Sequence, residues 1–198
     1  MSKIVLASAS PRRSQLLKES GIDFVIDASR ADEISDISAE PSSLVLANAR
    51  LKAEDVASRH CENIVLGADT IVAFGGKIYG KPKDLTQAHA MLTQLSGNTH
   101  SVFTGIALIY IFENGQKIII NNFEESRVTF KKLNSKQIDE YLCKVNVLDK
   151  AGAYAAQECG SMIIEKIEGN FDNVMGLPCG LVKNELDTIS NRIQYNRL

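Results

Sequence analysis

The sequence has no paired cysteines, no long apolar run, no excess of positive charge and no tryptophan. Its four cysteines lie far apart without a Cys-x-x-Cys pair, and its three histidines are scattered, so we expect no structural zinc site. No stretch resembles a membrane span or a secretion signal. A net charge of −2 provides no overall field that would attract nucleic acid. These absences favour a protein of the reducing cytoplasm that binds neither membranes nor nucleic acids.

The chain is long enough for one sizeable domain or two small lobes, with 198 residues, of which 44% are hydrophobic and 23% charged. No repeat, low-complexity segment or linker divides it, so we expect a single domain over residues 1–198. Apolar runs predict strands, and amphipathic runs with start and stop signals predict helices. The expected strands are residues 4–6, 24–26, 64–74, 77–79, 102–112, 118–120, 127–130 and 163–167, and the expected helices are residues 11–21, 40–59, 84–97, 134–145 and 181–189.

The first turn of the chain has the features of an anion-binding site. The strand at residues 4–6 runs into a loop of small residues, after which Ser10 stands at a helix N-cap position and Pro11 at the first helical position. Arg12 and Arg13 follow at once. Backbone donors, the positive end of a helix dipole and guanidinium groups together favour an anion. The alternative is an ordinary strand–helix junction with two solvated arginines.

The helix expected at residues 40–59 has a polar stripe between apolar flanks. Asn48, Lys52 and Asp55 share one face, because they are spaced four and three residues apart. Such a stripe suggests a helix edge that looks into a cleft. The alternative is a single lysine that extends to the surface and pairs with Asp55.

A carboxylate interrupts the apolar strand at residues 64–74. Asp69 in this position is costly without a partner, and the preceding Gly67 and Ala68 clear space for something to approach. We favour a functional role, the alternative being that Asp69 caps a strand end. Lys81 lies between a glycine and a proline, which defines its position; it is either a site residue or a surface lysine in a turn.

Two other stretches are less regular. Residues 27–41 are polar and acidic and contain Asp32 and Glu33, so spacing alone predicts a solvated loop. Residues 149–157 are rich in small side chains. They cannot pack as a core helix, and we expect them to line a surface that something else contacts.

Several short motifs together resemble one known family nearly from end to end. They are residues 6–13, 32–33, 52–53, 67–70, 80–82, 95–97, 149–154 and 176–178. In this order and spacing the chain resembles the Maf family of nucleoside triphosphate pyrophosphatases. The resemblance implies an α/β fold with an elongated mixed β-sheet flanked by helices and two lobes with a central cleft, similar to that of the inosine triphosphate pyrophosphatases.

The resemblance also implies an activity, the hydrolysis of a nucleoside triphosphate to the monophosphate and pyrophosphate with a divalent metal, Mg²⁺ or Mn²⁺. Asp69 matches the family's catalytic base, and Glu33 with Asp69 would hold the metal. The phosphate-binding positions of the family are matched by Ser8, Arg13, Lys52 and Lys81. Phosphoryl chemistry needs an activated water, cations and a metal, and these residue types supply them. How Asp69 and Glu33 divide their roles is left open.

Three further positions suggest the substrate. Arg12, Thr70 and Gln157 match the branch of the family that acts on dTTP and UTP, whereas the branch acting on 7-methyl-GTP has tryptophan in place of Arg12. A tryptophan face suits a cationic methylated base, and this chain has none. The Gln157 amide offers one donor and one acceptor, which match the edge shared by thymine and uracil. We therefore expect a preference for dTTP and UTP. Modified pyrimidines are left open as further substrates, and 7-methyl-GTP or another modified nucleotide is the alternative.

Other functions are also compatible with parts of the pattern. Maf-like proteins have been linked to inhibition of septum formation, so a nucleotide-binding regulator of cell division is one alternative, although it would not need both Asp69 and Glu33. An inosine triphosphate pyrophosphatase is less compatible with the opening residues 8–13, and a nucleotidyltransferase normally has a phosphate loop richer in glycine. Members of the family are often dimers, which leaves a homodimer open.

Overall fold

The computed structural model describes residues 4–35 and 40–197. The strands are β1 (Ile4–Leu6), β2 (Phe24–Ile26), β3 (Val65–Phe74), β4 (Lys77–Tyr79), β5 (Thr99–Ile111), β6 (Lys117–Phe130) and β7 (Ile164–Glu168). The helices are α1 (Pro11–Glu19), α2 (Pro41–Ala57), α3 (Leu85–Leu95), α4 (Ser135–Leu142), α5 (Phe171–Met175) and α6 (Cys179–Asn196), with short 3-10 turns η1 (Ala151–Ala153) and η2 (Gly160–Met162).

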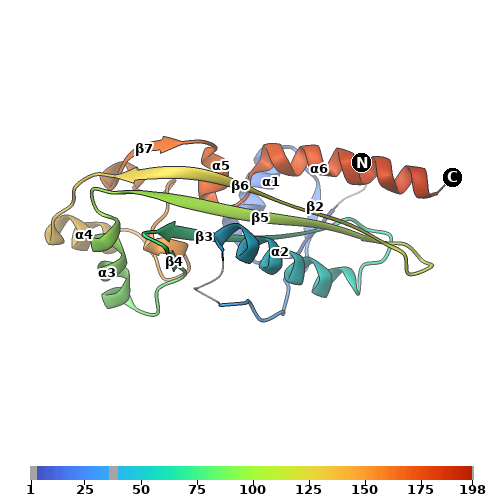
Figure 1. The fold of residues 1–198 in the computed structure, drawn as a ribbon, viewed down its shortest axis with the longest axis horizontal. Helices are drawn as coiled ribbons and strands as arrows, with labels where there is room; N and C mark the ends of the chain where they lie inside the picture. The colour runs from blue at the N-terminus through green and yellow to red at the C-terminus, as the bar shows by residue number, and fades with distance from the viewer. Residues whose placement is uncertain (1–3, 36–39, 198) are drawn as a thin grey trace.

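These strands form one mixed sheet, and the predicted fold class is confirmed. Its order is β2-β1-β3-β5-β6-β7, with β4 paired to β3. Strand β1 is parallel to both β2 and β3, whereas the other pairs are antiparallel. The β5–β6 hairpin runs along the length of the molecule (Figure 1), and its turn contains Asn114 and Gly115, as the sequence predicts.

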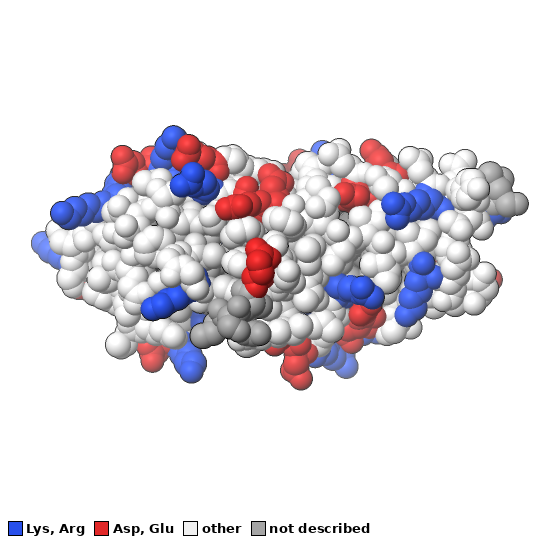
Figure 2. Space-filling model, in the orientation of Figure 1, with Lys and Arg blue, Asp and Glu red and all other residues white. Residues whose placement is uncertain are grey.

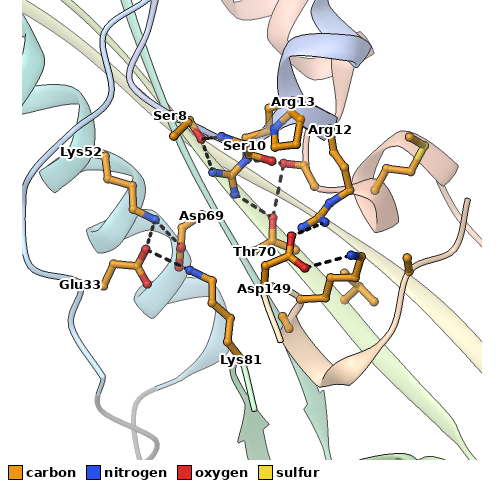
Figure 3. A pocket seen from close by; sticks show the side chains of 18 of the residues that line it. Ser8, Ser10, Arg12, Arg13, Glu33, Lys52, Asp69, Thr70, Lys81 and Asp149 are labelled. Atoms are coloured by element: carbon orange, nitrogen blue, oxygen red, sulfur yellow. Dashed lines mark hydrogen bonds and ion pairs between the residues drawn. The ribbon is translucent and has the colours of Figure 1, made fainter. Parts of the chain in front are cut away.

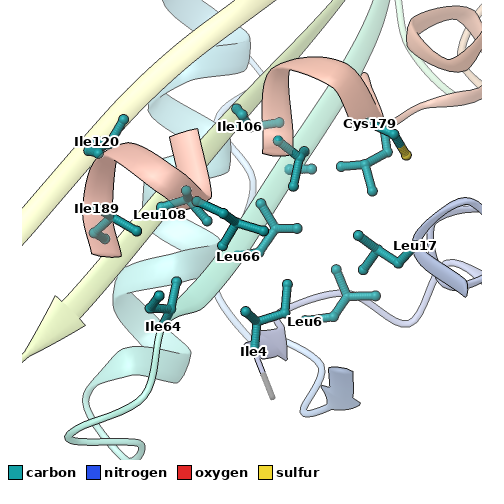
Figure 4. Packing of buried hydrophobic residues seen from close by; sticks show 14 of the residues in the cluster. Ile4, Leu6, Leu17, Ile64, Leu66, Ile106, Leu108, Ile120, Cys179 and Ile189 are labelled. Atoms are coloured by element: carbon teal, nitrogen blue, oxygen red, sulfur yellow. The ribbon is translucent and has the colours of Figure 1, made fainter. Parts of the chain in front are cut away.

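Helices cover the two faces of the sheet at the end that carries β1. Because side chains alternate along a strand, β5 sends Ile106 and Leu108 to one face and Ala107 and Ile109 to the other. The first pair packs with α1 and α6, as Figure 4 shows for the cluster around Leu66. The second pair packs against α2. Strand β5 is therefore buried on both faces there, as its apolar sequence predicts.

A second core lies toward the opposite end of the same sheet. Helices α3 and α4 lie there with β7 (Figure 1), and Leu92, Phe130, Tyr141 and Ile163 are fully buried among them. The two cores are the two lobes that the sequence predicts. They share β3, β5 and β6, so these strands hold both lobes in one frame.

The largest errors of the sequence prediction concern three elements. Helix α6 begins at Cys179 and continues to Asn196, and the short helix α5 was not predicted. Strand β6 is continuous, whereas the sequence predicted two pieces at residues 118–120 and 127–130. The missing middle is polar because its alternate side chains are exposed, so polarity there marks an open sheet face rather than a loop.

Surface and covalent features agree with the composition. On the face shown in Figure 2, lysine and arginine are interspersed with aspartate and glutamate without a continuous basic patch. All four cysteines lie in described segments and are free thiols. Within residues 4–35 and 40–197, every helix is too short or too polar to span a membrane.

Two glycines let α2 lie directly on the sheet. A Cβ atom on Gly67 of β3 would stand 2.2 Å from the carbonyl oxygen of Ala49, and one on Gly105 of β5 would stand 2.5 Å from that of Val45. The sequence correctly predicted a close approach at Gly67, and the element that approaches is the backbone of α2. This contact brings the polar stripe of α2 to the level of Asp69.

We expect Gly105→Ala to lower the free energy of unfolding by about 1–3 kcal/mol, because the added methyl group must push α2 off the sheet. Urea unfolding at neutral pH measures this effect. Gly180→Ala is the matched control, because nothing lies within 4 Å of the Cβ position of Gly180. Equal stability of the two variants would contradict the close packing of α2.

A buried histidine in the second core should make stability depend on pH. His100 is 2% exposed, its Nε2 lies 2.9 Å from the hydroxyl of Tyr154, and its ring packs edge-on against Phe130. Burial lowers the pKa of His100 to about 4. Because the folded pKa lies below the unfolded value, the unfolded chain binds more protons between these values, and stability falls as the pH drops through that window.

We therefore expect protonation of His100 to lower the free energy of unfolding of the wild type by on the order of 3 kcal/mol as the pH falls from about 6.5 to about 4. Urea unfolding across this pH range compares the wild type with His100→Gln, whose glutamine side chain cannot titrate. Carboxylates contribute to both curves, so the difference between them isolates His100. Parallel curves would show that His100 is not buried as a neutral ring.

Candidate active site

A cavity of about 420 Å³ lies between the two lobes. Its walls come from the turn between β1 and α1, the loop before α2, α2 itself, the middle of β3, the turn after β4 and residues 149–157 (Figure 3). Every predicted site residue lines this one cavity: Ser8, Arg12, Arg13, Glu33, Lys52, Asp69, Thr70, Lys81 and Gln157. The fold thus gathers side chains that are separated by up to 149 positions in the chain.

The centre of the site is a lysine between two carboxylates. Asp69 is 6% exposed and its Oδ1 lies 2.7 Å from the Nζ of Lys52, which lies 2.9 Å from Oε1 of Glu33. Asp69 stands in the middle of β3 opposite Gly105, so it does not cap a strand end. Lys52 pairs with these two acids and not with Asp55, so the simpler interpretation of the α2 stripe was wrong.

Glu33 is anchored although spacing alone predicted a solvated loop. Asp55 accepts a hydrogen bond from the backbone N–H of Arg30 at 2.9 Å, and Arg59 binds Asp27 at the start of the loop. Partial burial acts to raise the pKa of Glu33, but the hydrogen bond and charge of Lys52 outweigh it and keep that pKa below its ordinary value. Glu33 is therefore ionised at neutral pH.

Arg13 is held by three acceptors and is not a solvated arginine. Its Nε donates to the carbonyl of Gly176 at 3.0 Å, its Nη1 to Oγ of Ser8 at 3.1 Å and its Nη2 to Oγ1 of Thr70 at 3.3 Å. Burial lowers the pKa of Arg13. The group still remains a cation, because the ordinary pKa of arginine lies far above neutral pH. Arg13 is thus a rigid positive charge in the cavity wall.

The start of α1 also offers backbone donors. Ser10 occupies the N-cap position with Pro11 after it, as predicted, but the Ser10 side chain makes no capping bond. The Ser10 N–H instead donates to Oγ of Ser8 at 3.2 Å. The first-turn N–H groups of α1 are therefore not consumed by a side-chain cap, and the residues around them line the cavity.

The predicted specificity residues differ in their surroundings. Nη1 of Arg12 lies 3.0 Å from Oδ2 of Asp149, whose Oδ1 contacts Lys150 at 2.9 Å. Oγ1 of Thr70 lies 3.0 Å from that of Thr104 as well as near Arg13, so Thr70 belongs to the network that holds Arg13. Gln157 lines the cavity from the small-residue segment, so part of this segment faces the cavity, and its contact with a ligand stays a prediction.

Lys81 lies at the mouth of the site. Its side chain is 60% exposed and its Nζ is 3.8 Å from Oε1 of Glu33. Sequence reasoning assigned no role to Asn48, Thr104, Asp149 or Lys150, which are also part of these networks. The polar stripe on α2 was the signal for Asn48, and Asp149 and Lys150 lie in the segment 149–157 that was expected to line a contact surface, whereas nothing in the sequence indicated Thr104.

The donor set fits a hard divalent cation that shares its ligands with a substrate. Among residues 4–35 and 40–197, no group of three or more histidine, cysteine or acidic side chains is arranged to hold a metal on its own. Glu33 and Asp69 provide two carboxylates side by side. Mg²⁺ commonly binds through one or two carboxylates and completes its shell with water and phosphate oxygens.

Comparison with known proteins agrees with this geometry. The family model "Maf-like protein" matches residues 3–189. The chain is similar to the dTTP/UTP pyrophosphatase of Bacillus cytotoxicus, at 41% identity over 94% of this chain and 95% of that protein. It is equally similar to the dTTP/UTP pyrophosphatase of Agathobacter rectalis, at 41% identity over 94% of this chain and 97% of that one.

Solved structures show only a distant likeness. A nucleoside-triphosphatase (dITP/XTP pyrophosphatase) from Mycobacterium abscessus covers 66% of this chain and is itself 75% covered, with 15% identity and a TM-score of 0.37. The Ham1 protein of Staphylococcus aureus covers 65% of this chain and is 72% covered, with 16% identity and a TM-score of 0.39.

We expect Lys52→Met to lower the free energy of unfolding at pH 7 by about 3 kcal/mol, because it leaves buried Asp69 next to Glu33 without a cation between them. Urea unfolding measures this loss. Lys81→Met is the control, since an exposed lysine 3.8 Å from its partner should contribute little. Similar losses in both variants would mean that Lys52 does not neutralise the pair.

Proposed function

The chain belongs to the Maf-like protein family, and we propose that it hydrolyses nucleoside triphosphates, with dTTP and UTP preferred, to the nucleoside monophosphate and pyrophosphate. One observation carries this proposal: fixed cations and a pair of carboxylates face each other across a single cavity. Phosphoryl transfer needs both, cations to neutralise the phosphates and carboxylates to handle a metal and a proton.

The triphosphate binds along the cationic side of the cavity. Arg13 presents a rigid guanidinium next to the hydroxyl of Ser8, and the N-terminus of α1 adds backbone donors. Lys52 and Lys81 approach from the opposite wall. Because the groups are held in place before substrate arrives, little reorganisation opposes the reaction.

Asp69 is the proposed general base. Lys52 and Asn48 hold its two oxygens, at 2.7 and 3.2 Å, which fixes the direction of the carboxylate. The oxygen of a water attacks the α-phosphorus, the bond to the bridging oxygen of the β-phosphate breaks, pyrophosphate leaves and Asp69 takes the proton of the water.

Glu33 and Asp69 would hold the divalent metal, Mg²⁺ or Mn²⁺. The metal supplies Lewis-acid stabilisation of the charge on the phosphate oxygens when it is bound. The contribution of the chain is to hold the two carboxylates close together through their ion pairs with Lys52, which also keeps the pKa of Glu33 below its ordinary value.

The nucleobase of the substrate is recognised at the opposite end of the cavity. The Gln157 amide lines the cavity and matches the donor and acceptor edge that thymine and uracil share. Arg12, tied to Asp149, closes the wall between α1 and the segment that carries Gln157. Two relatives that are 41% identical are named for dTTP and UTP, which supports this choice.

The proposed partner is a free nucleotide. A net charge of −2 disfavours a nucleic acid, whereas the cationic wall of the cavity suits a small anion. Four free thiols suit the reducing cytoplasm as the site of action. The homodimer stays a prediction.

We expect the wild type to release pyrophosphate from dTTP and UTP faster than from CTP, 7-methyl-GTP, ITP or dATP, with Mg²⁺ or Mn²⁺ present. Asp69→Asn should lower kcat by about 10²–10⁴-fold, because it removes the base but keeps the volume of the side chain. A pyrophosphate-release assay across the panel measures both effects. Arg50→Gln is the control, because Arg50 is an exposed residue of α2 that does not line the cavity.

The contrary outcomes are distinct. Preferred turnover of 7-methyl-GTP or ITP would keep the enzyme and overturn the role of Arg12, Thr70 and Gln157. Binding without turnover of any nucleotide would favour a nucleotide-binding regulator of cell division. Full activity of Asp69→Asn would move the base to another residue, with Glu33 the next candidate.

A further inference from the structure

Asn48 is a buried polar side chain that holds more than the carboxylate of Asp69. It lies on α2 one turn before Lys52 and is 3% exposed. Its Oδ1 accepts the backbone N–H of Ile34 at 2.8 Å. Its Nδ2 donates to the carbonyl of Ile34 at 3.1 Å and to Oδ2 of Asp69 at 3.2 Å.

The chemistry of its partners fixes the orientation of the Asn48 amide. The N–H of Ile34 can only donate, so the atom facing it at 2.8 Å has to be the amide oxygen. The NH₂ group is then turned to the two acceptors that it contacts among residues 4–35 and 40–197, the carbonyl of Ile34 and the carboxylate of Asp69. Both hydrogens of the amide are used, and the side chain has one stable arrangement.

This arrangement links the two carboxylates through a neutral group. Ile34 directly follows Glu33, so the amide holds the backbone from which Glu33 reaches Lys52. The same amide holds the oxygen of Asp69 that Lys52 leaves open. Asp55 and Arg59 anchor the earlier part of the loop, at Arg30 and Asp27, but these contacts lie away from Glu33.

We propose that Asn48 is a positioning residue that sets the placement of Glu33 relative to Asp69, and thereby the affinity of this pair for a divalent cation. The part that concerns catalysis rests on the proposed function. Residues that orient metal ligands typically change metal affinity or activity by about 10–100-fold when they are replaced. Asparagine is suited to the task because it accepts from an N–H and donates to a carboxylate at the same length without adding charge.

Two replacements separate these properties. Asn48→Asp keeps the shape and can still accept from Ile34, but it places a negative charge against Asp69. Asn48→Leu keeps a similar volume and makes no hydrogen bond, so the Glu33 end of the loop loses its anchor. Val56→Ala is the matched control, because Val56 is buried on the same helix against the sheet, does not line the cavity and should reduce stability alone.

The experiment measures Mn²⁺ binding by electron paramagnetic resonance for each protein, alone and with thymidine monophosphate. It also measures kcat and KM for dTTP at saturating metal, well below the Tm of each variant. We expect Asn48→Leu to raise the Kd for Mn²⁺ by about 10–100-fold. In Asn48→Asp the added negative charge attracts the cation, so its Kd should stay below that of Asn48→Leu. Both variants should lower kcat, with KM close to wild type. Val56→Ala should leave the Kd and kcat unchanged while its Tm falls.

The outcomes distinguish this inference from the proposed function. An Mn²⁺ Kd in Asn48→Leu equal to that of Val56→Ala would overturn the inference, even if dTTP is hydrolysed. So would a wild type that binds no Mn²⁺ in either condition. A wild type that hydrolyses no nucleotide but binds Mn²⁺ more tightly than Asn48→Leu would overturn the function and support the positioning role. If Asp and Leu at this position prevent folding, Asn48→Ser gives the same comparison with a smaller change.

Discussion

The site depends on the ion pairs that the buried ammonium group of Lys52 makes with Asp69 and Glu33. Without it, Asp69 would be a carboxylate inside an apolar strand with a second carboxylate, Glu33, beside it, which costs several kcal/mol or forces one acid to take up a proton. With it, both acids have a cation within 2.9 Å next to the cavity, and the pKa of Glu33 is kept below its ordinary value. The charge that makes the site chemically useful is thus also what makes it compatible with the fold.

The position of Lys52 follows from close packing of backbone on backbone. Gly67 and Gly105 remove the two Cβ atoms that would hold α2 away from the sheet, so its carbonyls reach the surface of β3 and β5. Because α2 lies this close to β3, the side chain of Lys52 reaches Asp69. Asn48, one turn earlier on the same helix, reaches Asp69 as well.

The sequence was informative where chemistry is local. The strand–turn–helix at Ser10, the hairpin at Asn114 and the odd carboxylate at Asp69 each have a physical signature within a few residues. Family resemblance then indicated which distant residues belong together. What remained hidden is what tertiary contact decides. The loop of Glu33 looked solvated, because the contacts that hold it come from α2, and the middle of β6 looked like a loop, because one face of the sheet stays open.

The net charge of the chain also fails to indicate the site, because the charge of the cavity lining differs from the average. A chain of net charge −2 should repel a triphosphate on average. Yet the cavity is lined by five basic side chains, Arg12, Arg13, Lys52, Lys81 and Lys150, and by three acidic ones, Glu33, Asp69 and Asp149. A nucleoside triphosphate with one divalent cation carries a net charge of about −2, which this local excess of positive charge can balance. Each of the three acidic side chains lies within ion-pair distance of at least one of these basic side chains. The charges of the cavity are therefore held in place by one another before a substrate binds. A nucleotide that arrives with its own metal ion meets cations and carboxylates that are already positioned.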